Sequence, residues 1–373
     1  MDIKKEIIRY SQKIGIDLIG FIKAEPLEEL RGLLNDRKSK NYLSGFEEED
    51  IEKRINPALT MKEANTIIVI AMSYYINDKE INYPKKYKYC GYISRSAWGM
   101  DYHIILKDKM EQLISFIKNK VDKLKYKYFV DTGPLVDRYL AYKANIGWYG
   151  KNNCIINKDY GSWIFIGYIL CNLDIESDKF CKNSCLNCNK CINSCPTGAL
   201  KDNYNYNAKK CISYLTQTKE ELDYELREKM GNNIYGCDTC QSVCPHNQKI
   251  ISKKNNFFYP NEFTYYPNLL EILEMSNKEF KEKYKMTAAG WRGKNIIKRN
   301  ALIAIGNIGD REVIDVIKKY LNEKSIMIRK YTAWAILKLD RKRGKNILIK
   351  HLKVEENSEV IEEINNLFKY FNI

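Results

Sequence analysis

The chain has 373 residues and a formal net charge of +15, from 62 Lys and Arg against 47 Asp and Glu. Hydrophobic residues make up 45% and charged residues 29%, which excludes a disordered, a collagen-like and a membrane-spanning chain. The first residues lack the apolar block of a signal peptide, so we expect a cytoplasmic protein. At this length we expect two or three domains, each able to bury a core.

The positive charge is concentrated near the C-terminus. Residues 285–353 hold 18 basic and 5 acidic residues, while the rest of the chain is close to neutral. A basic domain joined to a neutral body indicates a polyanionic partner. The alternative is a solvated, lysine-rich helical surface without a partner.

Residues 1–177 have the pattern of a mixed helix and strand domain. In chain order we expect a helix over 2–14, a strand over 65–75, a helix over 101–124, a strand over 126–130 and a strand over 162–173. Strands that alternate with helices favour an α/β layer architecture.

The remainder divides into two further predicted domains. Residues 178–250 carry nine of the twelve cysteines and few apolar runs, so we expect metal to hold them together. Residues 251–373 are predicted to be helical, because segments 297–309 and 328–340 repeat one apolar pattern with small residues on one face. This pattern is typical of a HEAT-type repeat. The predicted fold is therefore α+β and multidomain.

The cysteine spacing predicts two [4Fe–4S] clusters. The run Cys185, Cys188, Cys191 and Cys195 before Pro196 is C-x2-C-x2-C-x3-C-P, the bacterial ferredoxin signature. The second run consists of Cys237, Cys240 and Cys244 and is followed by Pro245. In this signature the fourth cysteine binds the other cluster. We therefore assign two ligand sets: Cys185, Cys188, Cys191 and Cys244 for the first cluster, and Cys195, Cys211, Cys237 and Cys240 for the second.

Disulfides and zinc are the competing interpretations of these cysteines. Disulfides are rare in cytosolic proteins, and two zinc sites would need neither the third cysteine of each run nor the prolines. Four cysteines fall outside the pattern: Cys90, Cys154, Cys171 and Cys181. The first three are predicted to be small buried residues.

A second candidate site lies in the polar, glycine-rich stretch 131–163. Asp131 ends a predicted strand, a usual position for active-site residues, although from the residues alone a cap of the helix that starts near Pro134 is the more common role. His103 can be structural or a ligand. Arg138 can pair with a carboxylate or contact phosphate.

Long motifs in all three regions resemble the epoxyqueuosine reductases. They are ISRSAWGMDYH (93–103), DTGPLVDR (131–138), IGWYGKN (146–152), GSWIFIGYIL (161–170), CISYLTQTKEEL (211–222), IYGCDTCQSVCP (234–245) and WRGKNIIKRNALIAIGNIGD (291–310). The resemblance implies reduction of epoxyqueuosine to queuosine at the wobble base of tRNA, the last step of queuosine biosynthesis. It also implies two [4Fe–4S] clusters, a base-off cobalamin and a low-potential electron donor of the ferredoxin or flavodoxin type. No feature of the sequence requires an oligomer, so we expect a monomer.

The resemblance also implies roles for single residues. Asp131 matches the family's proposed proton donor, and a carboxyl group covered by a cofactor loses hydration and can stay protonated. The implied cobalamin-binding residues are Arg54, Ser94, His103, Asp131, Lys151, Asn152, Asp238 and Thr239. The implied tRNA contacts are Arg138, Arg292, Lys294, Lys298 and Arg299.

Two other functions compete with this interpretation. A corrinoid and iron–sulfur reductase acting on a small molecule would share the cofactors but leave the basic tail unexplained. A nucleic-acid-binding protein with structural or redox-sensing clusters would not need cobalamin.

Overall fold

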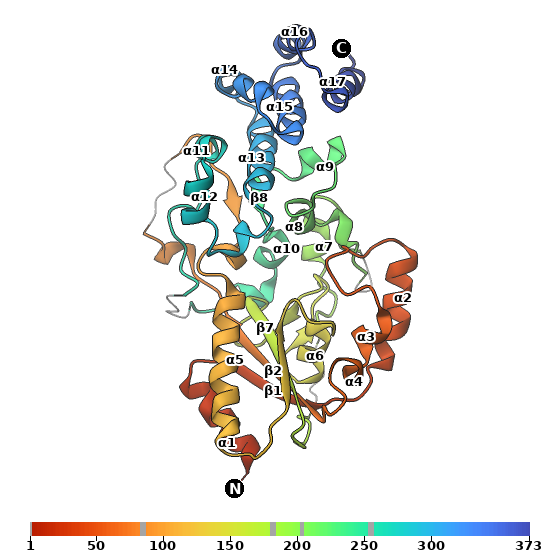
Figure 1. Cartoon of the computed structure of the whole chain (residues 1–373), viewed down its shortest axis with the longest axis vertical. Coiled ribbons are helices and arrows are strands. Elements are labelled where there is room, and N and C mark those ends of the chain that lie inside the picture. The colour runs from red at the N-terminus through yellow and green to blue at the C-terminus, as the bar shows by residue number, and fades with distance from the viewer. Residues whose placement is uncertain (1, 83–86, 180–183, 202–204, 253–256) are drawn as a thin grey trace. The chain divides into compact units, whose positions relative to one another are not determined.

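The computed structural model describes residues 2–82, 87–179, 184–201, 205–252 and 257–373. They form two compact units (Figure 1). Unit 1 comprises 1–80, 100–211 and 238–259, and unit 2 comprises 81–99, 212–237 and 260–373. Cys181 lies outside the described residues. The predicted division at 177 and 250 stays a prediction, because the segment 178–250 contributes to both units.

A four-stranded sheet forms the centre of unit 1. Its strands, in spatial order, are β1 (Leu18–Lys23), β2 (Thr66–Ser73), β7 (Ile164–Cys171) and β4 (Tyr126–Val130). The three predicted strands are confirmed, whereas β1 was not predicted. Every neighbouring pair is antiparallel. The mixed helix and strand content is therefore confirmed, but the parallel sheet typical of α/β layers is absent from this sheet.

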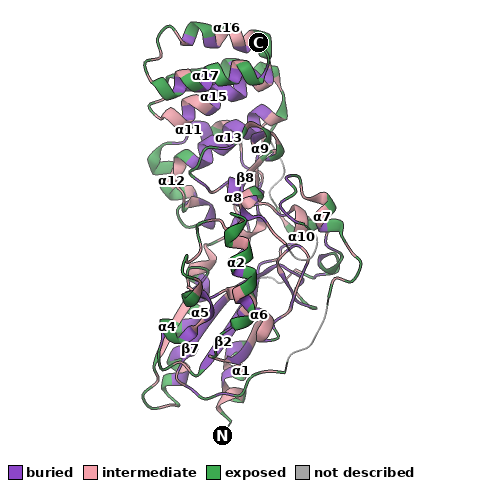
Figure 2. Ribbon diagram, turned by 90° about the vertical axis from the view of Figure 1, so that its right-hand side faces the viewer, coloured by how far each residue is buried: buried purple, intermediate pink, exposed green. Residues whose placement is uncertain are grey.

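Helices cover both faces of this sheet, and apolar residues of β2 pack toward each face. All eight residues of β2 are buried. Ile68 and Ile70 pack against the face that carries α1 (Ile3–Lys13) and α5 (Tyr102–Lys118). Ile67 and Val69 pack against the face that carries α6 (Asp137–Lys143), α2 (Arg31–Ser39) and α3 (Ile51–Ile55). The alternation follows from the two-residue period of a strand, and Figure 2 shows the buried interior of the sheet.

The helix predicted over 101–124 is α5, and it is shorter than expected. It starts after Asp101, whose side chain accepts a hydrogen bond from the His103 N–H, and it ends at Lys118. Asp101 thus satisfies one of the free N–H groups at the helix start. Unit 1 also contains α4 (Pro57–Thr60), β5 (Trp148–Tyr149), β6 (Ile155–Ile156), α7 (Lys190–Ser194) and α10 (Thr239–Ser242).

Unit 2 is mainly helical, as predicted for the tail. Its small parallel sheet joins β3 (Tyr92–Ile93) to β8 (Asn233–Tyr235). Its helices are α8 (Ile212–Leu215), α9 (Tyr224–Lys229), α11 (Leu269–Glu274), α12 (Asn277–Lys283), α13 (Lys294–Ile308), α14 (Ile314–Ile317), α15 (Ile326–Leu339), α16 (Arg341–His351) and α17 (Ser358–Tyr370). No helix among the described residues is both long and apolar enough to cross a membrane.

The repeated pattern lies on α13 and α15, which pack closely in Figures 1 and 2. Ala304 and Ala335 occupy matching positions of the repeat, and both are fully buried. Gly306 faces α15, because a Cβ added there would lie 2.7 Å from the Trp334 ring. The small residues therefore set how closely the two helices approach.

We expect Gly306→Ala to destabilise the protein by about 1–3 kcal/mol, because the new methyl group overpacks the contact with Trp334. Gly32→Ala on α2 is the matched control, since a Cβ there meets nothing within 4 Å. There the higher helix propensity of alanine should stabilise by up to about 1 kcal/mol. Denaturant unfolding of both variants checks the difference. An equal change in the free energy of unfolding for both variants would mean that the packing of α13 against α15 does not need a glycine at position 306.

Candidate functional site

Four cysteine thiols line one cavity in unit 1. They are Cys185, Cys188, Cys191 and Cys244, the residues predicted for the first cluster, and Lys151, Asn152, Ile156, Lys190, Pro245 and His246 complete the lining. The cysteines come from two distant segments of the chain, and the structure brings them together as the spacing predicts. The assignment as cluster ligands stays a prediction.

Local backbone geometry explains how the first three thiols face one point. The Cys188 N–H donates to the Cys185 carbonyl oxygen at 3.1 Å, which closes a tight turn. Leu186 inside this turn has a φ of 48°, in the left-handed region. Cys191 then lies in α7, and Cys244 precedes the short 3-10 helix Pro245–Asn247. Proline fits this first helical position because its missing N–H would be unpaired there in any case.

The chemistry of these thiols fits a cationic metal cluster. Burial and the neighbouring thiols of Cys185 and Cys244 raise the pKa of Cys191 to about 11. Burial and the thiols of Cys185 and Cys188 also raise the pKa of Cys244. Four thiolates gathered in a partly buried cavity repel one another unless iron compensates their charge. Binding of iron would therefore release protons from these thiols.

Three of the four cysteines predicted for the second cluster belong to unit 1. Cys195 directly follows α7. Burial raises its pKa, but hydrogen bonds from nearby backbone N–H groups and from Thr197 bring the pKa below its usual range. Cys211 forms a side-chain hydrogen bond with Tyr206, and Cys240 lies in α10. Cys237 belongs to unit 2 and directly precedes Asp238. All cysteines in the described ranges are free of disulfides.

Asp131 follows β4 directly and is exposed. Its backbone has a φ of 57°, an uncommon left-handed conformation for a residue other than glycine. The Tyr102 hydroxyl donates to Asp131 Oδ2 at 2.7 Å. The Asp131 N–H donates to Asp137 Oδ2 at 3.1 Å. Tyr102 therefore holds the carboxyl group of Asp131, and Asp137 holds its backbone.

Asp137, the first residue of α6, is the second acid of this site. Burial and the nearby Asp131 raise its pKa to about 8. Asp137 is therefore largely protonated at neutral pH, and the two adjacent carboxyl groups do not both carry a charge. Sequence reasoning missed Asp137, although it lies inside the DTGPLVDR motif.

We expect Asp137→Asn to stabilise the protein at pH 8 by at least about 1.4 kcal/mol, the equivalent of one pKa unit. The folded protein holds a proton on Asp137 that the unfolded chain releases above its ordinary pKa of 3.8. The wild type therefore loses stability as the pH rises from about 4 to about 8, and asparagine removes this loss while keeping the oxygen acceptor. The free energy of unfolding of the variant and the wild type, measured at pH 4 and at pH 8, checks this prediction. A variant with equal gains at both pH values would show that Asp137 titrates normally.

Two predicted cofactor-binding residues have buried polar atoms without a hydrogen-bond partner. Arg54 is 8% exposed and Asn152 is 5% exposed. The Arg54 Nη1 and Asn152 Nδ2 atoms are buried and have no partner in the described part of the chain. An unpaired buried donor costs about 1–3 kcal/mol. Both therefore fit an absent ligand that offers acceptor oxygens.

The other predicted cofactor-binding residues have partners within their own units. Lys151 Nζ donates to Asn189 Oδ1 at 2.7 Å, and His103 Nδ1 lies 2.8 Å from Asp101 Oδ1. Asp238 is buried and precedes Thr239, the first residue of α10. In unit 2, the Ser94 hydroxyl accepts a hydrogen bond from the Ser96 N–H. These contacts neither support nor oppose a role of these residues in binding a cofactor.

The predicted tRNA contacts fall into two groups. Arg138 is exposed, and Arg292 and Lys294 are partly exposed. Lys298 is only 6% exposed and lies 3.7 Å from Glu323. Arg299 is fully buried, and its guanidinium donates to the backbone oxygens of Leu215 and Thr218 and to Asn300 Oδ1. Its position corrects the expected phosphate contact, because Arg299 anchors 212–218 to α13.

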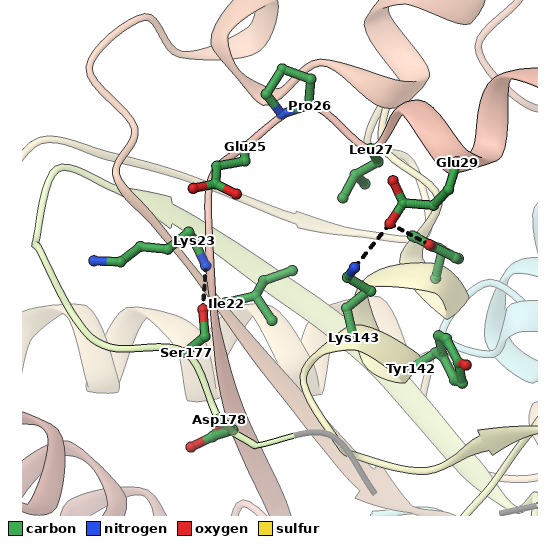
Figure 3. Close-up of a pocket in the computed structure, with 11 residues that line it drawn as sticks. Ile22, Lys23, Glu25, Pro26, Leu27, Glu29, Tyr142, Lys143, Ser177 and Asp178 are labelled. Atoms are coloured by element: carbon green, nitrogen blue, oxygen red, sulfur yellow. Dashed lines mark hydrogen bonds and ion pairs between the residues drawn. The ribbon is translucent and has the colours of Figure 1, made fainter. Parts of the chain in front are cut away.

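A cavity of about 580 Å³ beside β1 contains none of the predicted site residues (Figure 3). Glu29 Oε1 accepts hydrogen bonds from the Tyr139 hydroxyl at 2.6 Å and from Lys143 Nζ at 2.9 Å. These bonds lower the pKa of Glu29 to about 2. The charged groups of Glu29 and Lys143 are therefore already paired, and no catalytic constellation lies there.

Comparisons with known proteins define the class. Family models match in three successive places: the family described as epoxyqueuosine reductase QueG, DUF1730, at 54–132, a 4Fe-4S double cluster binding domain at 184–247 and HEAT repeats at 293–367. The predicted two-cluster segment and the predicted HEAT repeat are confirmed. With the cysteine cavity, these matches define an iron–sulfur oxidoreductase that carries HEAT repeats.

Full-length relatives define the family more narrowly. The epoxyqueuosine reductase of Bacillus cereus is 40% identical, over 97% of this chain and 96% of that protein. A crystal structure of epoxyqueuosine reductase with an epoxyqueuosine-modified tRNA-Tyr stem loop matches with a TM-score of 0.93 at 38% identity, over 100% of this chain and 99% of that one. The Bacillus subtilis enzyme, with its aspartate catalytic loop swung out of the active site, matches with a TM-score of 0.93 at 37% identity, over 98% of each chain. The chain belongs to the epoxyqueuosine reductase family.

Proposed function

We propose that this protein reduces epoxyqueuosine to queuosine at the wobble position of tRNA, the last step of queuosine biosynthesis. The observation that carries the proposal is the 40% identity to an epoxyqueuosine reductase over nearly the whole length of both chains. The double-cluster segment and the similarity to a relative bound to a modified tRNA stem loop support it.

The cofactors are two [4Fe–4S] clusters and a cobalamin, which we propose is bound base-off. The cavity lined by four cysteines fits the first cluster, and the unpaired buried donors of Arg54 and Asn152 fit the acceptor groups of a corrinoid. When bound, the clusters supply single electrons and the corrinoid supplies the cobalt centre that acts on the epoxide. We propose that Ser94, His103, Lys151, Asp238 and Thr239 complete the corrinoid contacts.

Asp131 is the proposed proton donor. Loss of the epoxide oxygen as water consumes two electrons and two protons, so the site needs an acid. The Tyr102 hydroxyl donates a hydrogen bond to Asp131 Oδ2. The proton for the departing oxygen would therefore be carried on Asp131 Oδ1. Asp137 holds the backbone of Asp131, and the loop of a relative that swings out of its active site carries an aspartate. We infer that Asp131 acts from such a loop.

The basic residues at the start of α13 are the proposed tRNA contact in unit 2. Lys294 is the first residue of this helix and Arg292 lies just before it, and both are partly exposed. We add Arg138 in unit 1. Lys294→Gln should weaken binding of an epoxyqueuosine-modified stem loop and reduce the slope of log K against log salt by about 0.7–0.9. Lys278→Gln on α12 is the charge-matched control. A salt dependence that both variants leave unchanged would exclude this face.

Further proposals concern partners and organisation. We propose a cytoplasmic monomer that receives electrons from a low-potential ferredoxin or flavodoxin. We also propose three functional regions: 1–177 for cobalamin and catalysis, 178–250 for the two clusters and 251–373 for tRNA docking. The double-cluster match at 184–247 and the HEAT match at 293–367 support the last two.

The decisive experiment supplies epoxyqueuosine-containing tRNA, cobalamin and a low-potential reductant to anaerobically purified protein. Mass spectrometry of the digested tRNA should show queuosine. Turnover of the free nucleoside but not of tRNA would replace this function by reduction of a small molecule. Corrinoid uptake with no turnover of either substrate would overturn the proposed substrate.

A further inference from the structure

Exposed side chains surround the cavity that gathers the four thiols of unit 1. Leu186, between two of these cysteines, is 81% exposed. Lys190, Pro245 and His246 line the same cavity, and all three are exposed. The His246 ring packs edge-on against Trp148, with 5.2 Å between the ring centres. The thiols predicted to hold the first cluster therefore lie close to the protein surface.

Leu186 is an unusual residue for its place in this surface. Its φ of 48° lies in the left-handed region, which glycine and asparagine adopt more easily than a bulky side chain. Its side chain lies mostly in water, so burial does not offset the backbone cost. A single exposed leucine needs no explanation by itself. A strained and exposed leucine between two predicted cluster ligands favours a contact outside the fold.

The loops around the cavity carry positive charge without negative charge. Segments 184–201 and 239–252 contain three lysines and neither aspartate nor glutamate. Lys190 is one of the three and lines the cavity. Lys151, which also lines it, donates to the neutral amide oxygen of Asn189, and this contact leaves its charge uncompensated. Such a surface attracts and orients a negatively charged partner.

We propose that the surface formed by Leu186, Lys190, Pro245 and His246 docks a small acidic protein that carries single electrons. This inference rests on the proposed function, which consumes two electrons for each epoxide. In each encounter the reduced carrier loses one electron and the first cluster gains it, so two encounters supply one turnover. Weak electron-transfer complexes use small interfaces, and a patch of this kind is sufficient for one. We call it the carrier surface.

Its position favours an electron carrier over RNA as the partner. Electron transfer needs a close approach of donor and acceptor, and Leu186 lies between two predicted ligands of the first cluster. The basic start of α13 contains no cysteine, so a carrier bound there would meet no predicted ligand on that helix. An exposed leucine and proline also suit a protein partner better than a phosphate backbone, which is bound mainly through cations.

The test measures how fast two reductants reduce the anaerobic, cluster-loaded protein, followed by the EPR signal of the reduced clusters. Reduced flavodoxin is the acidic carrier, and reduced methyl viologen is a small cation that needs no docking surface. At low salt, Lys190→Gln should lower the second-order rate constant with flavodoxin by about threefold and Lys190→Glu by about tenfold. Neither variant should lower the rate constant with methyl viologen. Added salt should slow the flavodoxin reaction and reduce the difference between the variants.

Leu186→Asn tests the apolar part of the carrier surface. The rate constant with flavodoxin should fall by about threefold or more, because the variant removes apolar area that docking would bury. Iron content and stability should not fall, because asparagine suits the left-handed backbone. Lys13→Gln on α1 and Leu59→Asn on α4 are the matched controls, because both positions are exposed and lie outside the carrier surface. Both controls should behave as the wild type.

Three results would overturn the assignment. Equal slowing with flavodoxin and methyl viologen would show that the residues tune the cluster and dock nothing. Unchanged flavodoxin rates in all the carrier-surface variants would place docking elsewhere. Unchanged flavodoxin rates with weaker binding of the tRNA stem loop would assign the surface to RNA.

Failure of the proposed function would look different from failure of the carrier surface. Reduced methyl viologen bypasses docking, so a lack of queuosine with this reductant would remove the proposed function. The rate of cluster reduction by flavodoxin does not depend on tRNA, and it would still support or overturn the carrier surface.

Discussion

Asp131→Asn should lower kcat for epoxyqueuosine-containing tRNA by about 100-fold or more, the usual contribution of a general acid. Asparagine keeps the side-chain shape and accepts the Tyr102 hydrogen bond, but it has no acidic proton. It also tolerates the left-handed backbone at this position, so the loop should keep its conformation. The measurement is single-turnover conversion of modified tRNA, with iron and corrinoid content determined on the same sample.

Asp36→Asn, an exposed change on α2, is the control and should leave turnover unchanged. Tyr102→Phe should have a smaller effect than Asp131→Asn, because it loses the orienting hydrogen bond but keeps the acid. Near-normal turnover by Asp131→Asn with full cofactor content would remove Asp131 as the proton donor. The acid would then have to be another group or water.

Cys244→Ser should abolish tRNA reduction and lower the iron content from about eight to about four atoms per chain. Cys244 lines the cavity with the three cysteines of the other segment, so its loss opens one corner of the first cluster. A serine hydroxyl is a poor substitute for a thiolate toward iron. Iron analysis and the visible absorption of anaerobically purified protein check the prediction.

Cys90→Ser is the matched control, because Cys90 lies outside both ligand sets and belongs to unit 2. It should keep its iron and its activity. Full iron content in Cys244→Ser would mean that the ligand sets are assigned wrongly. Loss of all iron would instead show that the two clusters form only together.

The residue types that form the site could be predicted from the sequence better than the fold that surrounds them. The C-x2-C spacing encodes a local turn, so the meeting of Cys185 and Cys188 follows from a few residues of chain. Asp131 was predictable because β4 ends abruptly at Asp-Thr-Gly-Pro. The antiparallel order of the sheet could not be predicted, because strand direction depends on connections that local patterns do not specify.

Residues whose roles depend on packing were missed or misassigned. Arg299 lies in α13, which is buried on most sides, so its place in a basic stretch did not indicate exposure. The raised pKa of Asp137 arises from burial and from Asp131, and a sequence motif shows neither effect.

The cavity lined by Cys191 and Cys244 has a consequence for the lifetime of the protein. In the proposed ligand set, one iron cluster ties α7 to the residue before Pro245 and closes the intervening chain, including 212–237, into a loop. Such a cross-link reduces the entropy of the unfolded chain, as a disulfide does, and longer loops gain more. The iron cluster would therefore stabilise the fold as a reversible cross-link and also carry electrons. A cell short of iron, or exposed to oxidants that destroy the cluster, would lose the folded enzyme together with its activity.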